Sequence, residues 1–128
     1  MDRKLRALLL AATVCFTASS SLAANQGTGN DLLNHCQEAE RVLDNPRADG
    51  DMLKVGLCIG FVEGVKNSLL ILGSRDGTPP VSCTPPTLTN GQAIRVVLKY
   101  LRANPEQLHE SKFILTWLAF VTAYPCKP

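Results

Sequence analysis

The sequence predicts an all-α fold, a small four-helix bundle made of two antiparallel hairpins and stapled by two disulfides. Apolar residues recur three and four positions apart in four segments, which is the spacing of amphipathic helices. No stretch alternates apolar and polar residues as a half-buried strand would. Four cysteines follow the N-terminal leader, and an even number of cysteines in an exported chain indicates two disulfides.

The N-terminus has the layout of a secretory signal peptide. A basic segment at residues 2–6 precedes an apolar run at residues 7–16, and mostly small residues fill positions 17–24. The apolar run is shorter than the ~20 residues that span a bilayer. Ser21-Leu22-Ala23 is a small-x-small cleavage pattern, which predicts a signal peptide over residues 1–23 with cleavage after Ala23, or after Ala24 as the near alternative.

The remaining chain, residues 24–128, has the length of one domain and no net charge. Of the 13 basic and 11 acidic residues in the chain, the leader removes three and one, which leaves ten of each. A neutral domain lacks the electrostatic footprint of a protein that binds nucleic acid or anionic lipid. We therefore expect neither of these partners.

Two helices are predicted in the first half of the domain. The first is capped by Asn30 or Asp31 and ends near Asp44, because the residue before Pro46 is pushed out of the helical region. The second is opened by Asp49-Gly50-Asp51 and ends near Gly73. It carries one continuous apolar seam, formed by Val55, Cys58, Val62, Val65, Leu69 and Leu72.

Three glycines form a second stripe along this second helix. Each costs about 1 kcal/mol of helix stability relative to alanine, so we expect a neighbouring backbone to pack closely against Gly56, Gly60 and Gly64. A membrane-spanning helix with a Gly-xxx-Gly face is the alternative interpretation. Charges inside a span are expensive, and three charged residues argue against a membrane span: Lys54, Glu63 and Lys66.

A long loop and two further helices are predicted in the second half. Residues 74–86 contain four prolines and must form a loop, which is either functional or a simple crossover. Thr89-Asn90-Gly91-Gln92 matches a capping box and begins a helix that runs to about Ala103. The last helix runs from Asn104-Pro105 to about Ala123 and carries a ridge expected in the core: Phe113, Trp117, Phe120 and Tyr124.

The positions of the cysteines favour one pairing. Residues equidistant from a turn lie at similar heights on antiparallel helices. Cys36 and Cys58 are centred on the first turn and Cys83 and Cys126 on the second, so each pair is expected to close its own hairpin. The pairing Cys58–Cys83 with Cys36–Cys126 remains an alternative, because the long loop could fold back.

We find no constellation of residues for catalysis, a cofactor or a metal. The two imidazoles, His35 and His109, have no ligand-like spacing, and no Cys-x-x-Cys motif is present. A nucleophile needs an adjacent base, and Cys36 beside His35 is expected to be oxidised. Glu63 is expected to pair with Lys66 at the helix surface, and no phosphate-binding glycine loop is present. The sequence favours a binding protein over an enzyme.

The chain resembles the Rap/Tai immunity proteins of type VI secretion. The similarity lies in the segment Cys58-Ile59-Gly60-Phe61-Val62-Glu63-Gly64 and in pieces that follow it in the same order: Cys83-Thr84-Pro85, Gln92, Tyr100-Leu101, Pro105, Ala119 and Ala123-Tyr124-Pro125-Cys126. It covers the chain from Cys36 to Cys126.

The resemblance implies a periplasmic, all-helical and often dimeric protein that is not an enzyme. Such a protein protects its bacterium by binding a secreted peptidoglycan amidase and occluding the active-site cleft of that toxin. The matching residues specify a scaffold rather than a contact surface. We expect the toxin to contact the exposed Arg75 and Asp76 in the long loop.

Two other functions suit a small exported helical domain. A periplasmic stress chaperone would expose apolar surface to unfolded clients, and a lipid-binding protein would enclose an acyl chain between its helices. Suppressed aggregation of client proteins would favour the first, and lipid extracted from the purified protein would favour the second.

Overall fold

The computed structural model describes residues 27–73 and 79–127 as four α-helices and one short 3-10 helix. In chain order they are α2 (Gly29–Asp44), α3 (Met52–Gly73), α4 (Asn90–Ala103), η1 (Pro105–Gln107) and α5 (Lys112–Ala123). The predicted all-α, four-helix fold is confirmed. The predicted signal peptide lies outside the described residues.

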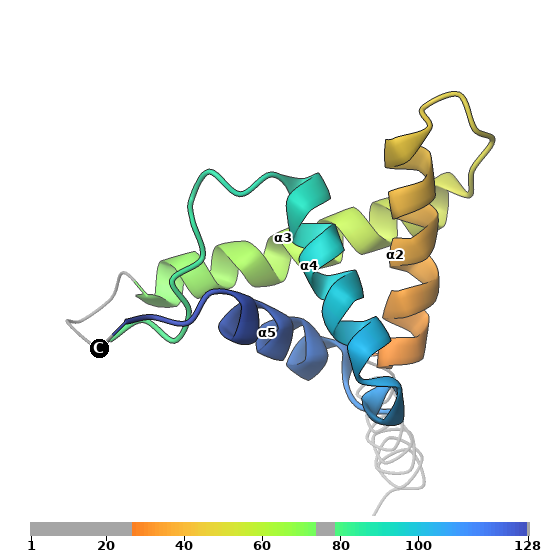
Figure 1. The fold of residues 1–128 in the computed structure, drawn as a ribbon. Coiled ribbons are helices and arrows are strands. Elements are labelled where there is room, and N and C mark those ends of the chain that lie inside the picture. The colour runs from red at the N-terminus through yellow and green to blue at the C-terminus, as the bar shows by residue number, and fades with distance from the viewer. Residues whose placement is uncertain (1–26, 74–78, 128) are drawn as a thin grey trace, which may run out of the picture.

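The helices pack around one core, and each of the four α-helices contacts the other three. Helix α3 passes behind α2 and α4 and crosses both, and it also contacts α5 (Figure 1). Every α-helix contributes buried side chains to the core, the largest of which are Phe120, Leu32, Ile94, Leu98, Leu101 and Leu115. The core is therefore shared by all four helices.

Both predicted disulfides are present. Cys36–Cys58 joins the middle of α2 to α3, and both residues are fully buried. Cys83–Cys126 joins the loop before α4 to the tail after α5. The second bridge is reinforced by the backbone N–H of Cys83, which donates to the Tyr124 carbonyl at 2.9 Å. The alternative pairing is excluded.

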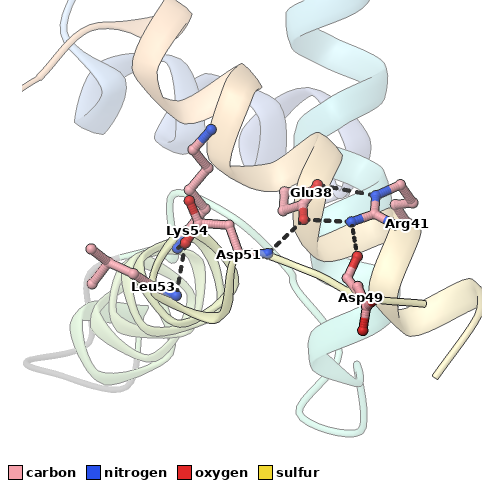
Figure 2. Close-up of polar contacts among 6 residues, drawn as sticks. All are labelled: Glu38, Arg41, Asp49, Asp51, Leu53 and Lys54. Carbon is pink, nitrogen blue, oxygen red and sulfur yellow. Dashed lines mark hydrogen bonds and ion pairs between the residues drawn. The ribbon is translucent and has the colours of Figure 1, made fainter. Parts of the chain in front are cut away.

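Glu38 and Arg41 of α2 fix the point where α3 begins (Figure 2). The Glu38 carboxylate accepts from Arg41 Nη2 at 2.6 Å and from the backbone N–H of Asp51 at 2.8 Å. Arg41 also donates to the Asp49 carbonyl at 2.6 Å. The Asp51 carboxylate in turn accepts from the backbone N–H groups of Leu53 and Lys54, as an N-cap residue does.

These contacts perturb the acid–base behaviour of Glu38. The Arg41 side chain and the Asp51 backbone N–H lower the pKa of Glu38 from its usual 4.5 to about 2. The carboxylate is therefore charged over almost the whole acidic range, and the turn between α2 and α3 is held by a charge-assisted network.

The start of α2 differs from the prediction. Thr28, not Asn30 or Asp31, is the N-cap, and Asp31 is the third residue of a capping box that Thr28 begins. Two hydrogen bonds from Thr28, to the Asp31 carboxylate, lower the pKa of Asp31. The helix therefore begins two or three residues earlier than expected.

The last helix, in contrast, begins later than predicted. Residues Pro105–Gln107 form only a 3-10 turn, and α5 begins at Lys112. The chain between them pairs with the start of α2: Gly29 N–H donates to the Glu110 carbonyl and Asn30 N–H to the Leu108 carbonyl, both at 2.9 Å. Uncapped amides at a helix start need acceptors, and an interrupted helix supplies them here.

The glycines of α3 do not have the neighbour that was predicted. A Cβ built on Gly56, Gly60 or Gly64 meets nothing within 4 Å, so no other described part of the chain packs against them. The close approach occurs at Gly29 instead, where a Cβ would meet Leu115 Cδ1 and the Leu108 backbone. The glycine stripe lies on the solvent side of α3.

By length and composition α3 could cross a membrane, with a mean hydropathy of 1.6 over 18 residues, a third of which are buried in the fold. Core helices of soluble proteins pass the same test. The disulfide at Cys58 and the buried side chains of Val62 and Leu69 tie α3 to the rest of the domain.

Candidate partner-binding surface

The titratable residues singled out in the sequence serve the fold in this structure. Lys66 is 7% exposed, and its Nζ donates to the Leu88 carbonyl at 3.1 Å and to Asn90 Oδ1 at 3.2 Å. Asn90 Nδ2 donates to Glu63 Oε2 at 3.2 Å. The expected direct pair of Glu63 and Lys66 is therefore wrong: Asn90 stands between them and connects α3 to the start of α4.

The two histidines lie on different elements, and neither is next to a free thiol among the described residues. His109 sits in the turn before α5, highly exposed, with Nε2 3.1 Å from Glu110 Oε1. His35 is a half-buried residue of α2, and its neighbour Cys36 is oxidised. Within residues 27–73 and 79–127, no three His, Cys, Asp or Glu side chains gather closely enough to hold a metal ion.

An apolar groove runs between the second half of α3 and the first half of α5. Its volume is about 330 Å³. Three of its side chains are largely exposed although they are apolar, with 58% exposure for Leu72, 45% for Phe113 and 46% for Ile114. The rest of the lining is formed by Val65, Ser68, Leu69 and Trp117. Contiguous exposed apolar side chains of this kind mark protein-interaction surfaces.

Lys112 directly precedes the groove residue Phe113 in the chain. Lys112, at the start of α5, places its Nζ 4.5 Å from the centroid of the Phe61 ring, an arrangement that is favourable for a cation over an aromatic face. The groove also ends where the long loop begins, because Leu72 is followed by Gly73, the last residue of α3. Arg75 and Asp76, the predicted contact residues, lie outside the described residues.

A second cleft, of about 540 Å³, separates α4 from α5 on another side of the molecule. Two of its polar side chains have hydrogen-bond partners: Asn104 Nδ2 donates to the Tyr100 backbone carbonyl at 2.8 Å, and the Tyr100 hydroxyl donates to Gln107 Oε1 at 3.3 Å. Lys99 adds a charge at its edge. The larger cleft therefore offers fewer exposed apolar anchors than the α3/α5 groove.

Comparison with known families settles the class of protein. The model of the Rap1a immunity proteins matches residues 28–126. The chain belongs to this family. The match begins at Thr28, the cap of α2, and ends at Cys126 in the second disulfide, so it covers all four helices. No curated protein and no solved structure matches the chain.

Membership of the Rap1a family confirms the resemblance that the cysteine and glycine motifs indicated. The protein is therefore an immunity protein, a class that acts by binding a secreted toxin effector and is generally not enzymatic. The groove was missed in the sequence because Phe113 was assigned to a core ridge and Leu72 to the buried seam. Phe120 of that ridge is fully buried, whereas Phe113, near the start of α5, is 45% exposed.

Proposed function

We propose that this Rap1a family member neutralises a peptidoglycan amidase delivered by type VI secretion, by binding the toxin and covering its active site. The observation that carries the proposal is the family match over residues 28–126. The exposed apolar groove between α3 and α5 supplies a surface on which a protein partner could be held.

The groove is suited to anchor the toxin. Binding energy at interfaces concentrates in a few large apolar or aromatic side chains surrounded by weaker contacts. Phe113, Ile114 and Leu72 provide such anchors, and Trp117 lies half-buried beneath them. We propose that Arg75 and Asp76 in the adjoining loop add polar contacts to the same partner.

The predicted leader and the two disulfides support a periplasmic location. Residues 1–23 are proposed to direct export, and disulfides persist in the oxidising periplasm rather than in the cytosol. A periplasmic binding protein would meet an incoming amidase beside the cell wall, before the wall is cleaved. We also propose that the protein acts as a homodimer.

The direct test is capture of the toxin. The full chain, expressed with its own leader and purified from the periplasm, should retain a cell-wall amidase from the secreted proteins of a competing strain. Phe113→Asp should reduce retention at least tenfold, because it places a charge in an apolar contact. Leu43→Asp, at a similarly exposed apolar position of α2 (43%), should retain the amidase normally.

Capture of no hydrolase by the wild-type protein would contradict the proposal. Equal losses for the two variants would show that the groove is not the contact surface. Circular dichroism of both variants is needed, so that a loss of binding is not confused with a loss of folding.

The exposed apolar residues on α3 and α5 also suit a second function, a periplasmic stress chaperone. This alternative predicts that the protein suppresses the aggregation of several unrelated client proteins in the absence of any toxin, even when there is less of it than of the client. A lipid-binding protein would instead carry lipid into organic extracts. Specific inhibition of one amidase without either activity favours immunity.

A further inference from the structure

The two disulfides differ in how open they are to solvent. Cys36 and Cys58 are both fully buried in the core between α2 and α3. Cys83 is exposed and Cys126 is half-buried, and their bridge joins the loop before α4 to the tail after α5. Thiol–disulfide exchange requires a thiolate to reach a sulfur of the bridge. In the folded protein the second bridge is therefore open to attack and the first is closed to it.

The loop that carries Cys83 is held by few other contacts. Residues 79–88 form neither helix nor strand, and all their side chains except those of Ser82 and Thr84 are exposed or only partly buried. The two hydroxyls share a hydrogen bond of 2.8 Å, and the Ser82 hydroxyl donates to the Phe120 carbonyl at 3.3 Å. The disulfide is thus the strongest tie between this loop and the end of α5.

The tail after α5 depends on the same bridge. Helix α5 ends at Ala123, and the Cys83 N–H donates to the Tyr124 carbonyl at 2.9 Å. Pro125 and Lys127, on either side of Cys126, are exposed. Figure 1 shows this tail running beside the loop that precedes α4. The bridge therefore joins two irregular, weakly packed segments.

The core does not depend on these segments. Its buried apolar side chains all lie in α2, α3, α4 and α5, and none of them comes from residues 79–88 or 124–127. The buried bridge still joins α2 to α3 when the exposed one is open. Segments with few buried contacts open locally at a lower free energy than the whole domain unfolds. The loop and the tail are therefore able to detach while the domain stays folded.

We propose that Cys83–Cys126 is a thiol–disulfide exchange site, which a dithiol reductant opens in the folded protein while Cys36–Cys58 stays closed. A thiolate of the reductant attacks Sγ of Cys83, the more exposed partner, and forms a mixed disulfide. The bond between the two cysteine sulfurs breaks, and Cys126 leaves as a thiolate that takes a proton from water. The second thiol of the reductant then attacks the mixed disulfide and releases Cys83. Two electrons pass from the dithiol, which becomes a disulfide, to the bridge, which becomes two thiols.

Opening this bridge acts on the end of α3. A Cβ at Gly73, the last residue of α3, would lie 2.9 Å from Pro80 Cβ, so the loop packs directly against the end of the helix. The preceding residue, Leu72, lines the apolar groove. Release of the loop therefore loosens one end of the groove. The effect on toxin binding rests on the proposed function, whereas the exchange itself does not.

Differential alkylation of the folded protein tests the proposal. The full chain, purified from the periplasm with both bridges formed, is incubated with dithiothreitol, quenched at intervals with iodoacetamide and mapped by peptide mass spectrometry. Cys83 and Cys126 should be alkylated roughly a hundredfold faster than Cys36 and Cys58, because reduction of a buried bridge waits for a rare opening of the core. Glutathione, a monothiol, should give a mixed disulfide on Cys83 with the alkyl group on Cys126.

Two variants of the loop separate this site from a general loosening of the fold. Ser82→Ala removes a contact that holds the loop to α5, so it should speed reduction of the exposed bridge about fivefold, the factor that corresponds to one lost hydrogen bond. The buried bridge should react as in the wild type. Thr87→Ala, at an exposed position of the same loop, is the matched control and should leave both rates unchanged.

Hydrogen exchange of the selectively reduced and alkylated protein shows which segments detach. Exchange should rise in residues 79–88 and 124–127 and stay unchanged in α2. A rise throughout the domain would contradict local detachment.

Equal alkylation rates for all four cysteines overturn the proposal, and so does a reduction rate of the exposed bridge that follows global unfolding in urea. A glutathione adduct found on Cys126 instead of Cys83 overturns the direction of attack. Selectively reduced protein that inhibits the captured amidase as well as the oxidised protein does contradicts the link to the groove. Selective reduction of a protein that inhibits no amidase in either state leaves the exchange site standing and contradicts only the proposed function.

Discussion

The Glu38 carboxylate accepts the backbone N–H of Asp51 at 2.8 Å, so the third turn of α2 holds the residue that begins α3. Arg41 stabilises the same carboxylate from the other side and also binds the turn at the Asp49 carbonyl (Figure 2). Since α3 lines the apolar groove that we assign to toxin binding, this junction helps to position that groove.

The junction predicts a specific dependence of stability on pH. The pKa of Glu38 is lower in the folded protein, about 2, than its usual 4.5, so its contribution is fully present above about pH 4.5 and is lost as the pH falls toward 2. Asp31, whose pKa is also lowered, adds to the loss in the same direction.

Glu38→Gln should therefore lower the melting temperature at pH 7, and the difference from wild type should shrink as the pH falls below 4.5 and vanish near pH 2. Glu106→Gln, at an exposed position of the turn before α5, is the control and should follow the wild-type curve. A difference for Glu38→Gln that persists unchanged at pH 2 would contradict the assignment.

Each disulfide should contribute several kcal/mol to stability. The rings close 22 and 43 positions, for which the chain-entropy model gives roughly 3 and 4 kcal/mol. Replacing Cys36 and Cys58 by alanine should cost more than the ring size suggests, because both are fully buried and smaller side chains leave a cavity. Urea unfolding of the two double variants measures the free energies, and unchanged midpoints would refute this account.

Alanine at two glycines should have opposite effects. Gly29→Ala forces a Cβ against Leu115 and the Leu108 backbone, which should cost about 1–3 kcal/mol. Gly64→Ala meets nothing within 4 Å and should stabilise the monomer by up to about 1 kcal/mol through helix propensity. Urea denaturation at low protein concentration, where any dimer dissociates, measures the change in the free energy of unfolding for each variant. The same sign for both would show that the packing around Gly29 is misjudged.

Removing Asn90 should destabilise the start of α4. Its side chain accepts from Lys66 and donates to Glu63, so Asn90→Ala leaves a buried ammonium with one fewer acceptor. A lost partner of this kind costs roughly 1–3 kcal/mol. Asn67→Ala, at an exposed position of α3, is the control. Equal unfolding midpoints for the two variants would argue against this role of Asn90.

Local patterns predicted most of the fold because most of it is determined locally. The turn at residues 45–51 lies midway between Cys36 and Cys58, and the capping box at Thr89 defines the start of α4. The start of α5 could not be found in this way. It depends on the amides of Gly29 and Asn30, which are about 80 residues away in the sequence and take their acceptors from the Leu108–Glu110 segment.

The exposed apolar surfaces were harder to predict for a different reason. Both sides of α3 are apolar, so periodicity identifies the seam of Val55, Cys58 and Val62 but does not show that the glycine side faces solvent. Phe113 has the same helical spacing as the buried Phe120, and only the packed structure shows that Phe113 is 45% exposed.

Inhibition of the amidase in solution tests the proposed immunity function most directly. Release of soluble peptidoglycan fragments by the captured amidase is measured while the protein, purified from the periplasm, is added in increasing amounts. Hydrolysis should stop near one protomer per toxin, and Phe113→Asp should leave the amidase active at the same ratio, whereas Leu43→Asp should inhibit like the wild type. Undiminished hydrolysis in an excess of folded, disulfide-bonded wild-type protein would contradict the account.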